Sequence, residues 1–405
     1  MNNFKRFFMR LYQKTLYIAS YFLSFKEPII IKGKNSFVSL ATLIKNYNKK
    51  KVLLVSDEDL HKLNLDKLVY EVLENEKVDY SLFYHITANP TIQQVELGVL
   101  TYKNDNCDCI VVIGGGSAMD AAKAIAARVA NPKMSINKMK GLLKIRRKLP
   151  LLIAIPTTAG TGSETTVAAV ISNPTTKEKF TIEDTKLIPS YAILNPTLLI
   201  NLPKHITATT GMDALTHALE AYIGKANTNK TKQYAIEAIQ LINQYLYVSY
   251  LEPENLLARE KMQIASYDAG VAFTRAYVGY VHAIAHTLGG FYKIPHGLAN
   301  AVILPIVLEE YGDCIIDKLS EIYDVLHLYS PLSNKQKAKA LIEMIYKLNQ
   351  DMNIPTNFKD IILDEDIPTM VKRAMKEANP LYPVPEIWGE DKFIKIFKRL
   401  QDKNN

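Results

Sequence analysis

The order of secondary-structure patterns along the chain is the feature that most restricts its fold. Between residues 28 and 156, short apolar runs typical of buried strands alternate with helical patterns. The expected strands are 29–31, 51–55, 80–84, 109–113 and 151–155, and the expected helices are 65–76, 95–104 and 118–129. Alternation of this kind predicts a parallel sheet with helices on both faces.

The pattern changes near residue 200. Strand-like runs fade, and long helical patterns follow at 211–222, 232–246, 258–273 and 334–348. The sequence therefore predicts a Rossmann-like α/β domain over residues 28–200 and an all-helical domain over 201–405. A length of 405 residues suits two domains of ordinary size.

Composition and charge exclude several classes of protein. Apolar residues make up 48% and charged residues 22% of the chain, as in soluble globular proteins. The three cysteines, Cys107, Cys109 and Cys314, form no C-x-x-C motif, which favours reduced thiols in a cytoplasmic protein. The net charge is +8, of which +5 lies in residues 1–26, where there is no acidic residue. The remaining +3 argues against a nucleic-acid partner.

The basic N-terminal segment is expected to form a separate amphipathic helix over residues 1–27. Its apolar residues Phe4, Phe8, Leu11, Ile18 and Phe22 fall near one helical face. The uncharged stretch 15–25 is too short to span a bilayer. Three interpretations stay open: a helix packed on the protein's own surface, peripheral membrane contact through residues 1–26, or a signal peptide without a clear cleavage site.

Two loops after expected strands have the character of a phosphate-binding site. The strand 109–113 leads into Gly114-Gly115-Gly116-Ser117 and then a helix, whose first N–H groups attract anions. The strand 151–155 leads into the sequence PTTAGTGSE, which is rich in hydroxyl groups and glycine. Both loops lie at the carboxyl edge of a parallel sheet, where open α/β folds bind ligands.

Asp57 ends the strand-like run KVLLVSD at the same expected edge. A carboxylate there can accept hydrogen bonds from the ribose of NAD and repel the 2′-phosphate of NADP. NAD is therefore expected over NADP. Asp57 precedes the glycine turn, unlike the acid of an ordinary Rossmann dehydrogenase, and a role as a turn or cap residue stays open.

Five side chains in the helical half are candidates for a metal site. Asp213 and His217 are four residues apart on one helix, and so are His282 and His286. His296 follows Gly289-Gly290, which we expect to end the second helix. Carboxylate and imidazole groups without thiolates suit iron, zinc, manganese or cobalt. The spacing leaves open which of the five would coordinate the ion.

Four segments together resemble the iron-containing alcohol dehydrogenases in order, content and spacing. They are GGGSAMDAAKA, PTTAGTGSE, LPKHITATTGMDALTHALEAY and GYVHAIAHTLGGFYKIPHGLANAVILP, and the resemblance runs from about residue 28 to the C-terminus. It implies a dinucleotide-binding α/β domain and a helical metal domain. It also implies hydride transfer between a small alcohol or aldehyde and NAD(H), and a homo-oligomer, expected as a dimer.

The resemblance also implies roles for individual residues. The implied metal ligands are Asp213, His217, His282 and His296, with Fe²⁺ as the expected ion and Zn²⁺ as the alternative. His286 would stand beside the nicotinamide and the substrate as a proton relay. The implied cofactor-binding residues are Asp57, Asn89, Gly115, Gly116, Ser117, Asp120, Thr157, Thr158, Thr161 and Lys179.

The sequence departs from the family at a few positions. Asn195 stands where relatives usually have an acid before a proline. Arg275 and Tyr277 stand where relatives have a small polar residue and a glycine. If both faced the substrate, they would narrow the pocket and favour small or anionic aldehydes; the alternative is packing at the surface.

Two other functions are compatible with parts of the sequence. A glycerol dehydrogenase-like or dehydroquinate synthase-like enzyme would also use NAD and a metal. The synthase should carry a cluster of Lys and Arg for a phosphate or phosphonate, which PTTAGTGSE and GMDALTH do not show. A peripheral membrane-binding protein with a decayed site is disfavoured because all four implied ligands are present.

Overall fold

The computed structural model describes residues 3–176, 178–326 and 331–401. The chain forms two compact units. One is Ser24–Leu202, and the other joins Met1–Leu23 to Pro203–Asn405. The chain changes from one unit to the other where the strand pattern fades in the sequence.

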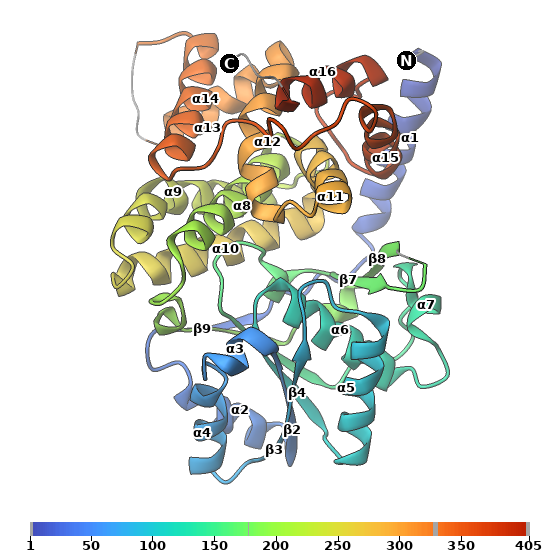
Figure 1. Ribbon diagram of the computed structural model, residues 1–405, viewed down its shortest axis with the longest axis vertical. Helices are drawn as coiled ribbons and strands as arrows, with labels where there is room; N and C mark the ends of the chain where they lie inside the picture. Colours follow the sequence, from blue (N-terminus) through green and yellow to red (C-terminus); the bar gives the residue numbers. More distant parts are fainter. Residues whose placement is uncertain (1–2, 177, 327–330, 402–405) are drawn as a thin grey trace. The chain divides into compact units, whose positions relative to one another are not determined.

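A parallel sheet forms the centre of the first unit. Its six strands lie in the order β1-β9-β6-β4-β2-β3, and all neighbouring pairs are parallel (Figure 1). They are β1 (Ile29–Lys32), β2 (Lys51–Asp57), β3 (Asp79–Ile86), β4 (Cys109–Gly114), β6 (Leu151–Pro156) and β9 (Tyr191–Leu194). β4 and β6 are buried along their whole length, which explains why they read as continuous apolar runs.

Helices cover both faces of this sheet, as predicted. α5 (Ile92–Asn104) packs against α6 (Gly116–Ala130) on one face, and α2 (Val38–Asn46) packs against α4 (Lys67–Asn75) on the other (Figure 1). In the β4–β6 pair, Gly114 lies opposite Pro156. The loops that follow these two strands are therefore neighbours, which is what a shared ligand site at this edge requires.

Several short elements of this unit were not predicted. β7 (Ala168–Asn173) pairs antiparallel with β8 (Glu178–Glu183), and β5 (Gly141–Leu142) joins β8 in a small second sheet. The short helices are α3 (Glu58–Lys62) and α7 (Ile136–Met139), and the 3₁₀ turns are η1 (Ser163–Thr165), η2 (Thr185–Leu187) and η3 (Pro196–Leu199). Asn195 caps η3, since its side-chain oxygen accepts a hydrogen bond from the Thr197 N–H at 3.0 Å.

The second unit is helical in its described residues, as predicted. Its helices after residue 202 are α8 (Lys204–Ile223), α9 (Asn229–Leu251), α10 (Leu256–Ala276), α11 (Tyr280–Tyr292), α12 (His296–Tyr311), α13 (Ile316–Val325), α14 (Asn334–Asp351), α15 (Ile367–Ala378) and α16 (Glu390–Gln401), with the 3₁₀ turn η4 (Gly312–Ile315). α8 packs against α9, α10 and α12 and is buried continuously from Gly211 to Ile223. Side chains on α8 therefore face the interior of this unit.

The N-terminal helix α1 (Asn3–Ser20) belongs to the helical unit. Arg10 donates two hydrogen bonds to the carbonyls of Val384 and Pro385, and Gln13 donates one to the carbonyl of Tyr382. The helix ends at Ser20, short of the predicted range 1–27. In the part of the chain that the structure describes, every helix is too short or too polar to cross a bilayer.

Candidate metal and cofactor sites

Three polar side chains lie on one face of the buried helix α8. Asp213, His217 and Glu220 occupy positions i, i+4 and i+7, which coincide on an α-helix. All three are buried. A buried face with two carboxylates and an imidazole needs partners from neighbouring helices, because unpaired charges inside a protein are costly.

The remaining histidines come from the next two long helices. α11 carries the buried His282 and the exposed His286, and α12 begins at the half-buried His296. The prediction that Gly289-Gly290 ends the helix was wrong, because α11 continues to Tyr292. The chain turns instead at Lys293, which has a left-handed backbone with φ of 57°. Glycine permits a turn but does not force one.

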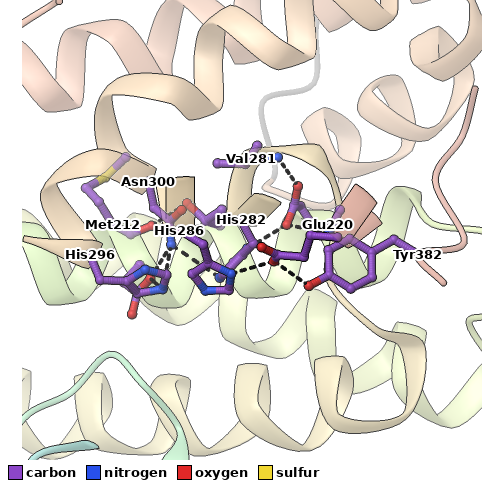
Figure 2. A network of polar contacts seen from close by, with 12 residues as sticks. Met212, Glu220, Val281, His282, His286, His296, Asn300 and Tyr382 are labelled. Atoms are coloured by element: carbon purple, nitrogen blue, oxygen red, sulfur yellow. Dashed lines mark hydrogen bonds and ion pairs between the residues drawn. The ribbon is translucent and has the colours of Figure 1, made fainter. Parts of the chain in front are cut away.

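The structure brings four of the five predicted side chains together. One nitrogen or oxygen atom of each of Asp213, His217, His282 and His296 lies within 4.8 Å of the other three. The Asn300 amide nitrogen lies 2.6 Å from Asp213 Oδ1, 3.2 Å from His282 Nε2 and 3.1 Å from His296 Nε2. Three acceptor atoms thus converge on one point (Figure 2).

This donor set fits a divalent cation. Burial raises the pKa of Asp213 and lowers the pKa of His282 well below the usual value for histidine. A neutral imidazole offers a lone pair, and a bound cation offsets the cost of burying a carboxylate. One carboxylate with three imidazoles suits Fe²⁺ or Zn²⁺.

His286 lies beside this cluster with a carboxylate partner of its own. Its Nδ1 is 2.6 Å from Glu377 Oε1, and Tyr382 donates its hydroxyl to the same oxygen at 2.9 Å (Figure 2). The Glu377 carboxylate raises the pKa of His286 and outweighs the opposite effect of the protein atoms around the ring. His286 stacks on His296 with ring centroids 5.0 Å apart, so it stands next to the four-residue cluster.

In the α/β unit, the predicted glycine and threonine residues face one another. A Cβ placed on Gly116 would meet Thr161 at 3.3 Å, and one on Gly115 would meet Thr158 at 3.7 Å. The Thr157 N–H donates to the Gly114 carbonyl at 3.1 Å, which joins the two loops. Threonine hydroxyl and methyl groups therefore lie close to the N-terminus of α6. A side chain larger than glycine at position 115 or 116 would occupy the space between the two loops.

A second group of predicted residues forms a hydrogen-bonded chain. The Asn89 N–H donates to Ser117 Oγ at 3.3 Å, and Lys179 Nζ donates to Asn89 Oδ1 at 2.6 Å. Asn89 has a left-handed backbone with φ of 61°, which asparagine tolerates better than most residues. Through Asn89, Lys179 is thus linked to Ser117 at the start of α6.

The two predicted acids have structural partners. Asp57 caps α3, since its Oδ1 accepts a hydrogen bond from the Leu60 N–H at 2.9 Å; its contact with a cofactor stays a prediction. Asp120 accepts hydrogen bonds from Ser163 Oγ at 3.0 Å and from the Val170 N–H at 3.1 Å. Both oxygens of Asp120 are engaged within the protein, so its contact with a cofactor stays a prediction.

Sequence reasoning missed four residues of these sites: Lys123, Glu220, Asn300 and Glu377. Lys123 is buried and donates to Ser163 Oγ, Thr166 Oγ1 and two carbonyls, which fastens the second loop to α6. Burial lowers its pKa to about 8. Helical spacing could have pointed to three of them, because each lies three or four residues from a predicted site residue on its own helix.

Arg275 and Tyr277 take positions that the sequence did not settle. The Arg275 guanidinium lies 4.9 Å from the centre of the Tyr21 ring, which follows α1. Tyr277 has a φ of 65° and a ψ of 175°, a backbone conformation that glycine adopts more readily than other residues. The contact of Arg275 with Tyr21 favours surface packing over pairing with a substrate carboxylate.

Comparison with known proteins identifies relatives along almost the whole chain. The family model described as iron-containing alcohol dehydrogenase matches residues 28–196, and that of the C-terminal part of the Fe-containing alcohol dehydrogenase family matches 207–401. The NAD-dependent methanol dehydrogenase of Bacillus methanolicus is 37% identical, over 87% of this chain and 93% of its own. Alcohol dehydrogenase 4 of Saccharomyces cerevisiae is 38% identical, over 93% of this chain and 97% of its own.

Solved structures agree with these matches. A 1,3-propanediol oxidoreductase superposes with a TM-score of 0.89 at 35% identity, over 93% of this chain and 99% of its own. An alcohol dehydrogenase from Oenococcus oeni gives 0.88 at 34% identity, over 93% and 100%. A sulfoacetaldehyde reductase from Bifidobacterium kashiwanohense in complex with NAD⁺ gives 0.84 at 27% identity, over 94% and 99%.

Proposed function

Since this chain belongs to the iron-containing alcohol dehydrogenase family, we propose that it interconverts a small primary alcohol and its aldehyde with NAD(H) and a metal ion held by Asp213, His217, His282 and His296. The family is one of NAD-linked, metal-binding oxidoreductases, and the chain is an enzyme of this class. The observation that carries the proposal is the convergence of one carboxylate and three imidazoles within 4.8 Å. The names of the relatives, which include methanol and 1,3-propanediol dehydrogenases, support a small substrate.

The chain's own residues would bind, orient and move protons in this reaction. When bound, the divalent ion supplies Lewis-acid polarisation of the substrate oxygen. His286 is proposed to exchange the hydroxyl proton through Nε2, because its Nδ1 is engaged by Glu377. Glu377 and Tyr382 hold the imidazole in place, which keeps that nitrogen in a fixed direction.

The α/β unit is proposed to bind the dinucleotide, which accepts or donates the hydride. Gly115, Gly116 and Ser117 present the N-terminal N–H groups of α6 to the pyrophosphate. Thr157, Thr158 and Thr161 would line the opposite side, with Asn89 and Lys179 next to Ser117. The second carboxylate oxygen of Asp57, which does not cap α3, would accept a hydrogen bond from the ribose of NAD, and its charge would repel the 2′-phosphate of NADP.

Several finer assignments also belong to this proposal. Fe²⁺ is proposed as the resident ion, with Zn²⁺ as the alternative, since the donor set suits both. Dimeric assembly and a cytoplasmic location stay predictions from the sequence. The glycerol dehydrogenase-like and dehydroquinate synthase-like alternatives are not favoured by the relatives found.

We also propose peripheral membrane contact, because α1 turns its apolar side away from the protein. Its polar side faces the protein, where Gln13 and Ser20 are buried, and its exposed side carries Phe4, Phe7, Phe8, Leu11 and Ile18. A surface helix normally buries its apolar face. With exposed Lys5 and Lys14 and no acid up to residue 26, this surface complements an anionic bilayer.

The catalytic proposal is tested by removing and restoring the ion. Protein purified without oxygen, stripped with a chelator and reloaded with Fe²⁺ or Zn²⁺ should oxidise NADH with a panel of aldehydes only when loaded. Asp213→Ala and His282→Ala should each lose ion retention, measured by elemental analysis, and lower kcat at least about 100-fold, since Lewis-acid stabilisation supplies several kcal/mol. Full activity of the stripped wild-type protein would contradict the proposal.

A further inference from the structure

A buried carboxylate stands directly behind one of the candidate metal ligands. Glu220 Oε2 lies 2.6 Å from His282 Nδ1, and both side chains are almost completely shielded from solvent. His282 Nε2, on the far side of the ring, lies 3.2 Å from the Asn300 amide nitrogen. Figure 2 shows Glu220 and Asn300 on opposite sides of His282.

The contacts of Glu220 fix which nitrogen of His282 carries the proton. A carboxylate only accepts hydrogen bonds, so Nδ1 at 2.6 Å must be the protonated nitrogen. Nε2 then carries the lone pair, and it lies 3.2 Å from the Asn300 amide nitrogen. The contact with Glu220 thus selects the tautomer in which the Nε2 lone pair points into the four-residue cluster.

Two backbone N–H groups hold the Glu220 carboxylate in this position. The Gly279 N–H donates to Oε2 at 2.7 Å and the Val281 N–H donates to Oε1 at 2.8 Å, at the start of α11. A Cβ on Gly279 would lie 2.6 Å from Oε1, so only glycine allows this approach. The carboxylate takes the place of an N-cap side chain for the helix that carries His282.

We infer that Glu220 is a positioning residue of the metal site, which sets the tautomer and ring orientation of His282 and strengthens it as a ligand. This inference rests on the proposed function, because it takes His282 as a ligand. A carboxylate hydrogen-bonded to a coordinating imidazole increases the basicity of the ligand and fixes its direction. Glu220, Asp213 and His217 share one face of α8, so a single helix supplies two ligands and the support of a third.

The substitution Glu220→Gln tests the inference with little change in shape. The Gly279 N–H, the Val281 N–H and His282 Nδ1 all donate to the carboxylate, whereas an amide has one accepting oxygen and one donating nitrogen. In either orientation, a donor meets a donor and the negative charge behind His282 is lost. The affinity for Zn²⁺, measured by competition with a chromogenic chelator, should fall roughly 10- to 100-fold.

The matched control is Glu377→Gln. Glu377 contacts His286 Nδ1 at the same distance of 2.6 Å, but His286 lies outside the four-residue cluster. Its Zn²⁺ affinity should stay within about threefold of the wild-type value. An equal loss in both variants would overturn the inference, because the effect would then follow any loss of charge near the site.

A double-mutant cycle separates positioning from a role in folding. His282→Ala should not retain the ion through purification, so its weaker Zn²⁺ binding is measured at higher Zn²⁺ concentrations. In this background, Glu220→Gln should change the Zn²⁺ affinity less than about threefold, because Glu220 acts on the ion through the His282 imidazole, which is absent. A loss of the same size in that background, or unchanged affinity of the single variant, would overturn the inference. The wild-type measurement separately tests the proposed function: Zn²⁺ affinity no tighter than that of Asp213→Ala would reject the metal site itself.

Discussion

Asp57 has two separable roles at the carboxyl edge of the sheet. Its Oδ1 caps α3, while its Oδ2 would lie 3.4 Å from a Cβ on Gly114, next to the glycine turn. Asp57→Asn should keep the cap, since Asn and Asp are equally good N-caps. Without the charge that repels a 2′-phosphate, the ratio of kcat/KM for NADP to that for NAD should rise at least about tenfold, equivalent to about 1.4 kcal/mol.

Steady-state kinetics with both cofactors and urea unfolding check this prediction together. Asp57→Asn should unfold at the wild-type midpoint, whereas Asp57→Ala, which also loses the cap, should be less stable by about 1 kcal/mol. A wild-type enzyme that already prefers NADPH would show that Asp57 does not select the cofactor.

Residue spacing predicted the candidate ligands better than it predicted their supports. Asp213 and His217, like His282 and His286, are four residues apart, and a helix brings such pairs to one face whatever it packs against. Spacing also places Glu220 and Asn300 on the helix faces that carry candidate ligands. Their contacts with His282 and Asp213, however, form only because α8, α11 and α12 meet there. That meeting depends on tertiary packing, which no local pattern contains.

Only some of the elements were predicted from the sequence together with their bounds. The bounds of α4, α5, α6, α9, α10 and α14 and of the buried strands β4 and β6 were predicted to within about five residues, and α8 begins seven residues before 211. The sequence analysis gave no bounds for α12, α13, α15 and α16. The hairpin β7–β8 was missed, since its strands alternate weakly and are half exposed. The helix α3 was missed because its five residues are too few to show apolar residues repeating with helical spacing.

The outward-facing apolar side of α1 leads to a prediction about binding to lipid. The protein should sediment with vesicles that contain anionic phosphatidylserine at low salt and be released at high salt, because screening weakens the attraction of Lys5 and Lys14. Phe8→Glu with Leu11→Glu should reduce the bound fraction at least about tenfold, since burying each side chain contributes about 1.5–3 kcal/mol.

The matched control for this pair lies on α5. Leu97 and Leu100 are 51% and 53% exposed, close to the 51% and 49% of Phe8 and Leu11, and have the same spacing on a helix. Leu97→Glu with Leu100→Glu should bind vesicles like the wild type. If the α1 variant instead changes only the sedimentation coefficient without lipid, the surface joins copies of the chain and not a membrane.

At the scale of the whole molecule, the two candidate sites are built within separate units. The four candidate metal ligands lie in the helical unit, and the predicted cofactor residues lie within Ser24–Leu202. A ligand that binds only the folded state stabilises it, by about 2.7 kcal/mol at 100 times its dissociation constant. Zn²⁺ should therefore slow hydrogen exchange mainly in the helical unit, and NAD⁺ mainly in the unit Ser24–Leu202.

Hydrogen–deuterium exchange with peptide resolution tests this division. Zn²⁺ should protect amides of α8, α11 and α12, and NAD⁺ should protect the N-terminal turn of α6 and the loop after β6. Asp213→Ala should abolish the protection by Zn²⁺ and leave that by NAD⁺ at Gly115 and Gly116, because Asp213 belongs only to the helical unit. Protection of α8 by Zn²⁺ that survives Asp213→Ala would mean that the ion binds without this carboxylate, and the proposed ligand set would be wrong.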